Sequence, residues 1–259
     1  MKTKLIFFDI EFTSLSPDAQ IISLGVISDC GKSFYAEFTD FDISRCDDWV
    51  RNNVVSKLQN IDTTTAILNG EIILCSKDSH KLIRESITCH LHDKFTNIGF
   101  ALKWWLSKFS DYKIQFVVDC GTWDWYWLLQ LLAEWDKTAC YDMLIIPDCN
   151  LSDEQKKEIC ENWSVVSGSS FIAKSNYEAK ATKQGLPKLA DNISPVPMDL
   201  NDLIAFKKGI SVSEAFDLNR EELAFPTKDS EPICYNSNDK HNSLCDAKVI
   251  KAIYEQLNS

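Results

Sequence analysis

Glycine and proline are scarce in this chain of 259 residues, with 8 and 7 copies. Such a composition excludes a collagen-like or low-complexity polypeptide. Long apolar runs are missing as well, because the longest, residues 125–133, falls far short of the roughly 20 residues of a membrane-spanning helix. Since 45% of the residues are hydrophobic and 25% are charged, we expect a globular protein with a substantial core.

Positive charge is also in short supply: 27 Lys and Arg face 38 Asp and Glu, which gives a net charge of −11. This balance excludes a nucleic-acid binder that works through a basic surface. It leaves open a protein that reaches phosphate groups through bound cations. The apolar patch at the N-terminus is interrupted by Asp9 and Glu11 before a signal-peptide core could form. We therefore expect a cytoplasmic protein with no membrane association.

The cysteines do not show the spacing of a metal site. None of the 10 cysteines belongs to a C-x-x-C pair. A structural zinc site needs two ligand pairs, and only Cys89-His90-Leu91-His92 resembles one. The other ligands would have to come from Cys75, Cys120 or Cys140. We favour reduced thiols, and we expect residues 89–92 on the mixed surface of a helix.

Hydrophobic patterning divides the chain into strands and helices. Runs rich in aromatic and β-branched residues predict strands at residues 4–12, 20–28, 33–38 and 113–119. Apolar residues at helical spacing and capping residues predict helices at residues 47–58, 78–110, 122–134, 152–163, 199–207, 219–224 and 242–257. This order predicts one α/β domain over residues 1–259, with a mixed sheet flanked by helices.

The pattern weakens between residues 141 and 197, which we interpret as an insertion before the C-terminal helices. Its role is open. It contains four lysines that are either a track for phosphate groups or part of a solvated loop: Lys174, Lys180, Lys183 and Lys188.

Two acids interrupt the apolar first strand. Asp9 and Glu11 lie two residues apart, so both side chains leave the same face of the strand. Two carboxylates are costly to bury unless a positive charge lies between them. A divalent cation is the simplest answer, because hard cations prefer carboxylate oxygen. The alternative is that the two acids only mark the exposed end of the strand.

Further acids lie at the ends of other elements. Asp124 falls in the first turn of a predicted helix, where the helix dipole favours a carboxylate, and Asp119 at the preceding strand end is its rival for any metal role. His241 precedes Asp246 of the last predicted helix. From there it can face the same site as a proton acceptor.

Together these segments resemble the DEDDh exonucleases, a superfamily of RNase H-like 3′–5′ exonucleases. Asp9-Ile10-Glu11-Phe12-Thr13-Ser14-Leu15 is similar to the family's D-x-E-T-T-G-L segment, and His241-Asn242-Ser243-Leu244-Cys245-Asp246-Ala247 to its H-N-A-L-x-D-A. Asn242 stands where the tyrosine subclass has its Tyr, so the histidine subclass is favoured. Residues 49–54 and 123–125 look like those of small mycobacterial 3′–5′ exoribonucleases.

The resemblance implies an RNase H-like fold and a two-metal phosphodiester hydrolysis. It implies that Asp9, Glu11, Asp124 and Asp246 bind two Mg²⁺ or Mn²⁺ ions and that His241 is the general base. It also implies that Phe12, Thr13 and Leu15 hold the terminal nucleotide, with the backbone near Thr13 facing the 3′ hydroxyl and the apolar groups packing against the base. Independently of the family, Trp125 beside Asp124 is the tryptophan that we expect to stack on a base.

The expected substrate is single-stranded RNA or a 3′ overhang of RNA. A DNA exonuclease of repair or phage type is the alternative, because the motifs do not separate RNA from DNA. A catalytically inactive nucleic-acid-binding module is a hypothesis from another class, and its mark would be a lost carboxylate. The sequence leaves open whether the protein forms a homodimer.

Overall fold

The computed structural model describes residues 1–16, 18–59, 63–68, 71–76, 82–83, 88–132, 143–145, 163–167, 170–173, 189–225 and 240–259. Among these residues, no helix combines the length and apolar character that crossing a membrane requires. Of the predicted helix at 152–163, the structure describes only Trp163, which is the first residue of strand β10 (Trp163–Ser167). The four lysines at 174–188 lie outside the described residues. The extent and role of the insertion at 141–197 therefore stay a prediction.

A six-stranded mixed sheet is the centre of the molecule, with the order β12-β8-β1-β2-β3-β7. Its strands are β1 (Thr3–Phe12), β2 (Ile21–Ser28), β3 (Ser33–Phe38), β7 (Thr88–Asp93), β8 (Lys113–Val118) and β12 (Met198–Asp199). β2 pairs antiparallel with β1 and β3, whereas the pairs β1–β8, β8–β12 and β3–β7 are parallel. β2 therefore runs against the other five strands, and this arrangement is consistent with the predicted α/β RNase H-like fold.

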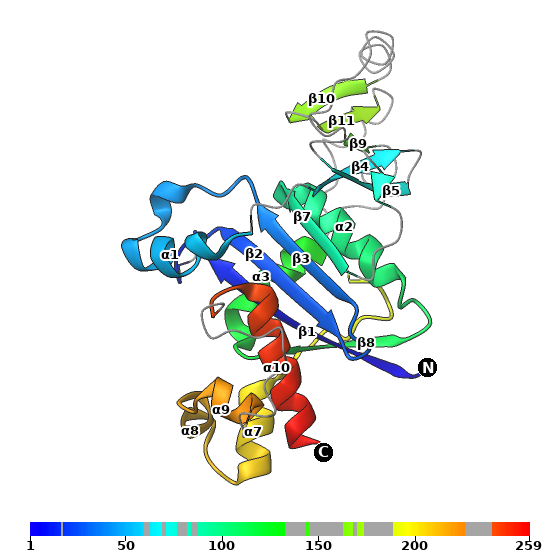
Figure 1. Cartoon of the computed structure of the whole chain (residues 1–259). Helices are drawn as coiled ribbons and strands as arrows, with labels where there is room; N and C mark the ends of the chain where they lie inside the picture. Colours follow the sequence, from blue (N-terminus) through cyan, green and yellow to red (C-terminus); the bar gives the residue numbers. More distant parts are fainter. Residues whose placement is uncertain are drawn as a thin grey trace.

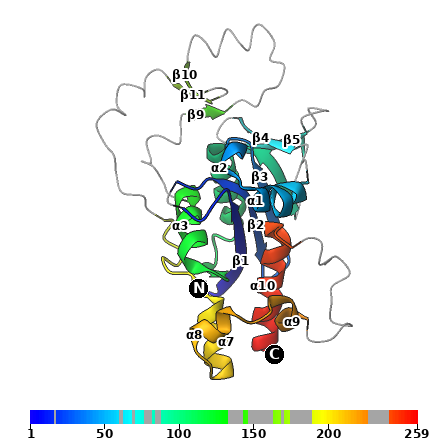
Figure 2. The same cartoon turned by 90° about the vertical axis from the view of Figure 1, so that its left-hand side faces the viewer.

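Helices cover both faces of this sheet (Figure 1). The α-helices of the described residues are α1 (Asp48–Asn53), α2 (Phe95–Ser107), α3 (Gly121–Leu132), α7 (Leu200–Lys208), α8 (Val212–Phe216), α9 (Arg220–Ala224) and α10 (Ser243–Leu257). Figure 2 shows α3 and α10 on opposite sides of the sheet. Two three-stranded sheets are separate from the main one: β4 (Thr63–Leu68), β5 (Glu71–Ser76) and β6 (Leu82–Ile83); and β9 (Met143–Ile145), β10 (Trp163–Ser167) and β11 (Ser170–Ala173).

Both faces of β1 are apolar because it is an interior strand covered by helices on both sides. Phe8 and Ile10 join the core formed with α2 and α3. Phe7, on the opposite face, joins the core formed with α7 and α10. Since side chains alternate along a strand, Asp9 and Glu11 follow Phe7 onto the α10 face. The register of β1 thus directs both acids toward the C-terminal helix.

The predicted helix at 78–110 is wrong in its first part, because Thr88–Asp93 forms the edge strand β7. Cys89 and Leu91 are buried and alternate with the half-buried His90, which is the period of a strand. Cys89-His90-Leu91-His92 is therefore part of a strand and no helix surface. The later part of the prediction is confirmed, since α2 runs unbroken from Phe95 to Ser107.

Two other predicted helices have different bounds. α1 begins after Asp47, whose side chain accepts from the Val50 N–H, but it ends at Asn53 and is followed by a 3₁₀ turn, η2 (Val55–Lys57). α3 begins at Gly121, so Thr122 lies inside the helix and does not cap it. The Gly121 N–H instead donates to Asp199 Oδ2 at 3.0 Å. Because Asp199 is distant from Gly121 in the sequence, no local pattern predicts this hydrogen bond.

Candidate active site

The structure brings together the five residues that the sequence singles out. Asp9 and Glu11 come from β1, Asp124 from the first turn of α3, and Asp246 from the first turn of α10, with His241 just before it. Potential ligand atoms of Glu11, His241 and Asp246 all lie within 4.8 Å of one another. Asp9 and Asp124 belong to the same cluster, because repulsion from Glu11, Asp246 and Asp124 contributes to the raised pKa of Asp9.

The four carboxylates of this cluster resist ionisation in the absence of a cation. Burial is the main cause, and it raises the pKa of Asp9 and of Glu11 well above their ordinary values. Burial also raises the pKa of Asp124 to about 8, against a hydrogen bond from the Ile10 backbone that lowers it. The pKa of Asp246 rises to about 7 for the same main reason, although the His241 N–H donates to its Oδ2 at 2.9 Å. A cation bound among these carboxylates would reduce the mutual repulsion of their charges and favour the ionised forms.

His241 has an unusual backbone conformation and a ring whose pKa is lowered. Its φ is 66°, and it is the one non-glycine residue with a positive φ in the described part of the chain. Its Nδ1 lies 3.9 Å from Glu11 Oε1, too far for a hydrogen bond. Burial, followed by the charges of Lys240 and Lys57, lowers the pKa of His241. Neutral imidazole, the form that can accept a proton, is therefore favoured near pH 7.

Trp49 of α1 forms one wall beside this histidine. Its ring packs edge-on against the His241 ring at a centroid distance of 4.9 Å, while 54% of the residue stays exposed. The sequence marked Trp49 only as part of a resemblance. No local signal could have paired it with a residue so far along the chain.

Buried hydrogen bonds anchor the N-terminus of α10. The Ser243 hydroxyl donates to Ser23 Oγ at 3.0 Å. The Asn242 side chain donates to the Tyr35 hydroxyl at 3.1 Å, and that hydroxyl donates to Glu37 Oε1 at 3.0 Å. All five side chains are buried. Because removal of one partner leaves a buried polar group unsatisfied, these bonds hold the turn that carries His241 and Asp246.

Gly25 of β2 allows α10 to lie directly on the sheet. It pairs with Asp9 in the β1–β2 ladder, and a Cβ at this position would lie 2.2 Å from backbone atoms of Ser243 and Leu244. A glycine inside a strand often marks such a close backbone approach. The absence of a side chain at Gly25 therefore brings the first turn of α10 to the two acids of β1.

We expect Gly25→Ala to lower the free energy of unfolding by about 1–3 kcal/mol, because α10 must shift to make room for the methyl group. Equilibrium unfolding in urea measures this change. Gly31→Asn is the comparison variant: nothing lies within 4 Å of a Cβ there, so its cost comes only from the φ of 84°, which Asn adopts more readily than most side chains. Equal stability of the two variants would show that α10 does not depend on the close approach.

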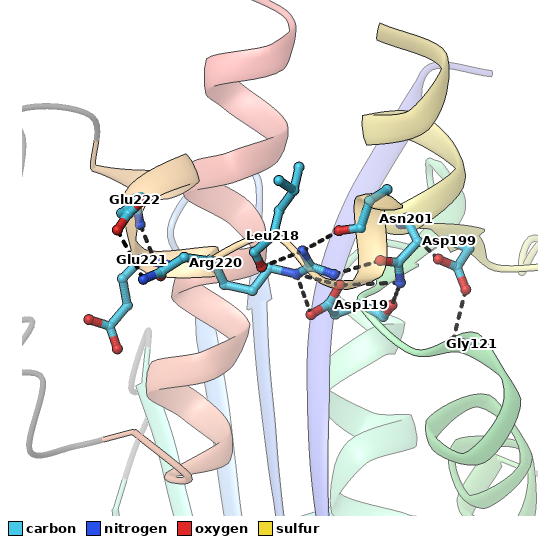
Figure 3. Close-up of polar contacts among 10 residues, drawn as sticks. Asp119, Gly121, Asp199, Asn201, Leu218, Arg220, Glu221 and Glu222 are labelled. Carbon is cyan, nitrogen blue, oxygen red and sulfur yellow. Dashed lines mark hydrogen bonds and ion pairs between the residues drawn. The ribbon is translucent and has the colours of Figure 1, made fainter. Parts of the chain in front are cut away.

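Asp119, the rival of Asp124, is held by a different partner. Arg220 Nε lies 3.0 and 2.8 Å from the two carboxylate oxygens of Asp119 (Figure 3). Asp124 is buried and has no such ion pair among the described residues. The structure thus distinguishes the two acids, because Arg220 pairs with Asp119 and leaves Asp124 buried among the other carboxylates.

The four predicted substrate-binding residues differ in their freedom to contact a ligand. Leu15 is 75% exposed, and Phe12 is half-buried beside Trp127 with ring centroids 6.5 Å apart. Thr13 is buried, and its N–H donates to the Gln20 carbonyl at 2.9 Å. This engaged amide is not a free donor for a 3′ hydroxyl.

Trp125 packs against the core of the sheet. Its ring centroid lies 6.4 Å from that of Phe8 and 5.7 Å from that of Phe116. Both partners are fully buried. These contacts give Trp125 a packing role and lend no support to stacking on a base.

Comparison with known proteins gives a short similarity. No protein-family model matches the chain. Two 3′–5′ exoribonucleases, from two strains of Mycobacterium tuberculosis, are each 40% identical to it over 52 residues. This stretch is 20% of the chain and 31% of each relative, so the chain spans about a third of the length of the curated relatives that it matches. The match supports a relationship to exonucleases and extends no further.

Proposed function

We propose that the protein is a metal-dependent 3′–5′ exonuclease of the DEDDh group that degrades RNA. The observation that carries this proposal is the meeting of four carboxylates and a histidine from three separate parts of the chain at one end of the sheet. The short similarity to the two mycobacterial exoribonucleases supports the same activity and favours RNA over DNA.

The donor set fits hard divalent cations. Asp9, Glu11, Asp124 and Asp246 offer carboxylate oxygens, the ligands that Mg²⁺ and Mn²⁺ prefer. Their raised pKa values show that the protein itself places too little positive charge near them to balance four carboxylates. These four residues would hold two ions, which when bound supply charge stabilisation for both the attacking and the leaving oxygen of a phosphodiester. The ions would also reconcile an acidic protein with a polyanionic substrate.

The protein's own residues supply proton transfer and substrate placement. Since Nδ1 of His241 faces Glu11, its Nε2 is the atom that would accept the proton of the attacking water. The exposed Leu15 and the half-buried Phe12 would contact the terminal base. The bond between the His241 N–H and Asp246 would keep the base and the carboxylates in one arrangement.

Divalent ions should stabilise the protein in a pH-dependent way. The pKa of Asp124 rises from 3.8 to about 8 and that of Asp246 from 3.8 to about 7 on folding. Folded values above the unfolded ones stabilise the protein fully below about pH 4, and this contribution is lost as the pH rises toward 8. We therefore expect metal-free protein to lose stability from pH 5 to 8, and Mg²⁺ or Mn²⁺ to raise the melting temperature more at pH 8 than at pH 5.

Asp9→Asn should blunt this rise, because it removes one ligand and one repelling charge. Asp111→Asn, which changes an exposed acid in a turn, is the control and should keep the full response. Melting curves at the two pH values, with each ion and with EDTA, measure the effect. An unchanged metal response in Asp9→Asn would remove Asp9 from the site.

A gel with end-labelled substrates tests the proposed activity directly. We expect 5′-labelled single-stranded RNA to shorten stepwise from its 3′ end with Mg²⁺ or Mn²⁺, and EDTA to stop the reaction. A 3′ phosphate should stall the enzyme, because the site is proposed to hold a terminal 3′ hydroxyl. Equal degradation of RNA with a 3′ phosphate and RNA with a 3′ hydroxyl would indicate an endonuclease or an exonuclease that starts at the 5′ end. Faster hydrolysis of matched DNA would show that DNA is the preferred substrate. If no strand is cleaved, the protein is a nucleic-acid-binding module without catalytic activity.

A further inference from the structure

Asp119 is a fifth carboxylate at the edge of the candidate active site. It follows β8 and precedes α3, the helix that carries Asp124. Repulsion from Asp119 contributes to the raised pKa values of Asp9, Asp124 and Asp246, so its charge lies close to all three. A carboxylate at such a place is a competing ligand for any cation bound there.

Arg220 of α9 occupies this carboxylate. Its Nε contacts both oxygens of Asp119, and one terminal nitrogen donates to Asn201 Oδ1 at 2.5 Å. The other terminal nitrogen donates to the carbonyl oxygens of Ala215 and Leu218 at 2.8 and 3.1 Å. All three guanidinium nitrogens therefore have partners (Figure 3), and the side chain is only 18% exposed. The guanidinium group is always charged, and hydrogen bonds from all three nitrogens fix its orientation.

The same network holds the turn between β8 and α3. The Asn201 side-chain amide donates to the backbone carbonyl of Asp119. Asp199 accepts from the Gly121 N–H at 3.0 Å and from the Asn201 N–H at 2.8 Å (Figure 3). Residues of β12, α7 and α9 thus set both the position of Asp119 and the start of the helix that carries Asp124.

We propose that Arg220 is a positioning residue of the site: by pairing with Asp119 it withdraws that carboxylate from the metal ligands, so that Asp124 completes the set. This inference rests on the proposed function. The adjacent guanidinium offsets part of the charge of a paired carboxylate and repels a cation that approaches it. Without Arg220, Asp119 becomes an available ligand beside Asp9 and draws the ions into an unproductive arrangement.

The test compares the wild type with Arg220→Met, Asp119→Asn and the double variant, by turnover of labelled RNA and by the rise in melting temperature with Mg²⁺. We expect Arg220→Met to lower turnover by about 10–100-fold, the range typical for the loss of a residue that supports a metal site without binding the metal. Its Mg²⁺-induced rise should be at least as large as in the wild type, because the freed Asp119 adds a ligand. The double variant should regain the turnover of Asp119→Asn, since no competing carboxylate remains.

Arg45→Met is the matched control. Arg45 pairs with Asp18 at 3.3 Å, and both side chains of this ion pair are well exposed. It should leave turnover and the metal response unchanged. Arg220→Lys retains the charge but loses most of the hydrogen bonds, so it should melt earlier and yet keep most of the turnover.

The inference is overturned by wild-type turnover in Arg220→Met, or by a double variant as impaired as Arg220→Met. If Arg220→Met does not fold, Arg220→Lys decides: folded protein with turnover near wild type supports the inference. Folded but inactive Arg220→Lys that Asp119→Asn does not rescue overturns it. A wild type with neither hydrolysis nor a metal response would instead contradict the proposed function itself.

Discussion

Asp124→Asn should abolish RNA hydrolysis, whereas Asp119→Asn should keep most of it. Asp124 is buried among the carboxylates, and its amide replacement removes both a charge and a metal ligand. Asp119 is paired with Arg220, so its loss takes nothing from the proposed ligand set. Turnover of labelled RNA with Mg²⁺ measures the contrast between the two variants.

Stability separates this loss of activity from misfolding. Because burial raises the pKa of Asp124 to about 8, an uncharged Asn at this position should leave metal-free protein at least as stable as the wild type above that pH. Melting curves without metal provide this control. The opposite pattern, an active Asp124→Asn and an inactive Asp119→Asn, would show that Asp119 is the ligand.

Replacing His241 should slow turnover by roughly 10²–10⁴-fold, the usual contribution of a positioned proton acceptor. His241→Asn is the more informative variant, because Asn tolerates the positive φ of 66° better than Ala does. It should keep the turn before α10, the four carboxylates and the rise in melting temperature with Mg²⁺. Turnover and melting curves of both variants, side by side, separate proton transfer from backbone geometry.

The pH dependence gives a second measure of the same role. Burial and two nearby lysines lower the pKa of His241 below its ordinary 6.5. Since only neutral imidazole accepts a proton, wild-type turnover should rise with pH on the acid side of 6.5 and then level off. The residual turnover of His241→Asn should lack this rise. Near wild-type turnover in His241→Asn would remove His241 from catalysis and leave it as a turn residue.

Local patterns in the sequence were sufficient for most of the sheet and for α10. The strands β1, β2 and β3 and the last helix have the predicted bounds within one residue, because alternation and capping are properties of neighbouring residues. The helix predicted at 78–110 is wrong over Thr88–Asp93. There the strand forms because β3 offers a partner in the parallel ladder, which the local sequence does not reveal.

The chemistry of the candidate site was also visible in the sequence. An apolar strand with Asp9 and Glu11, and a His before a helical Asp246, are short-range features that predict a cation and a proton acceptor. What remained open was how these segments meet. Their meeting depends on contacts such as Gly25 against the backbone of α10 and Asn242 with Tyr35, which are 207 residues apart.

The sequence by itself determined the residue types of the site, the strand that carries the first two acids and the helix that carries the last. Only the tertiary structure showed that Asp119 is paired with Arg220, which lies 101 residues further along the chain, whereas Asp124 is buried without such an ion pair among the described residues. Ion pairs of this kind depend on distance in space, and nothing in the residues next to either partner encodes that distance.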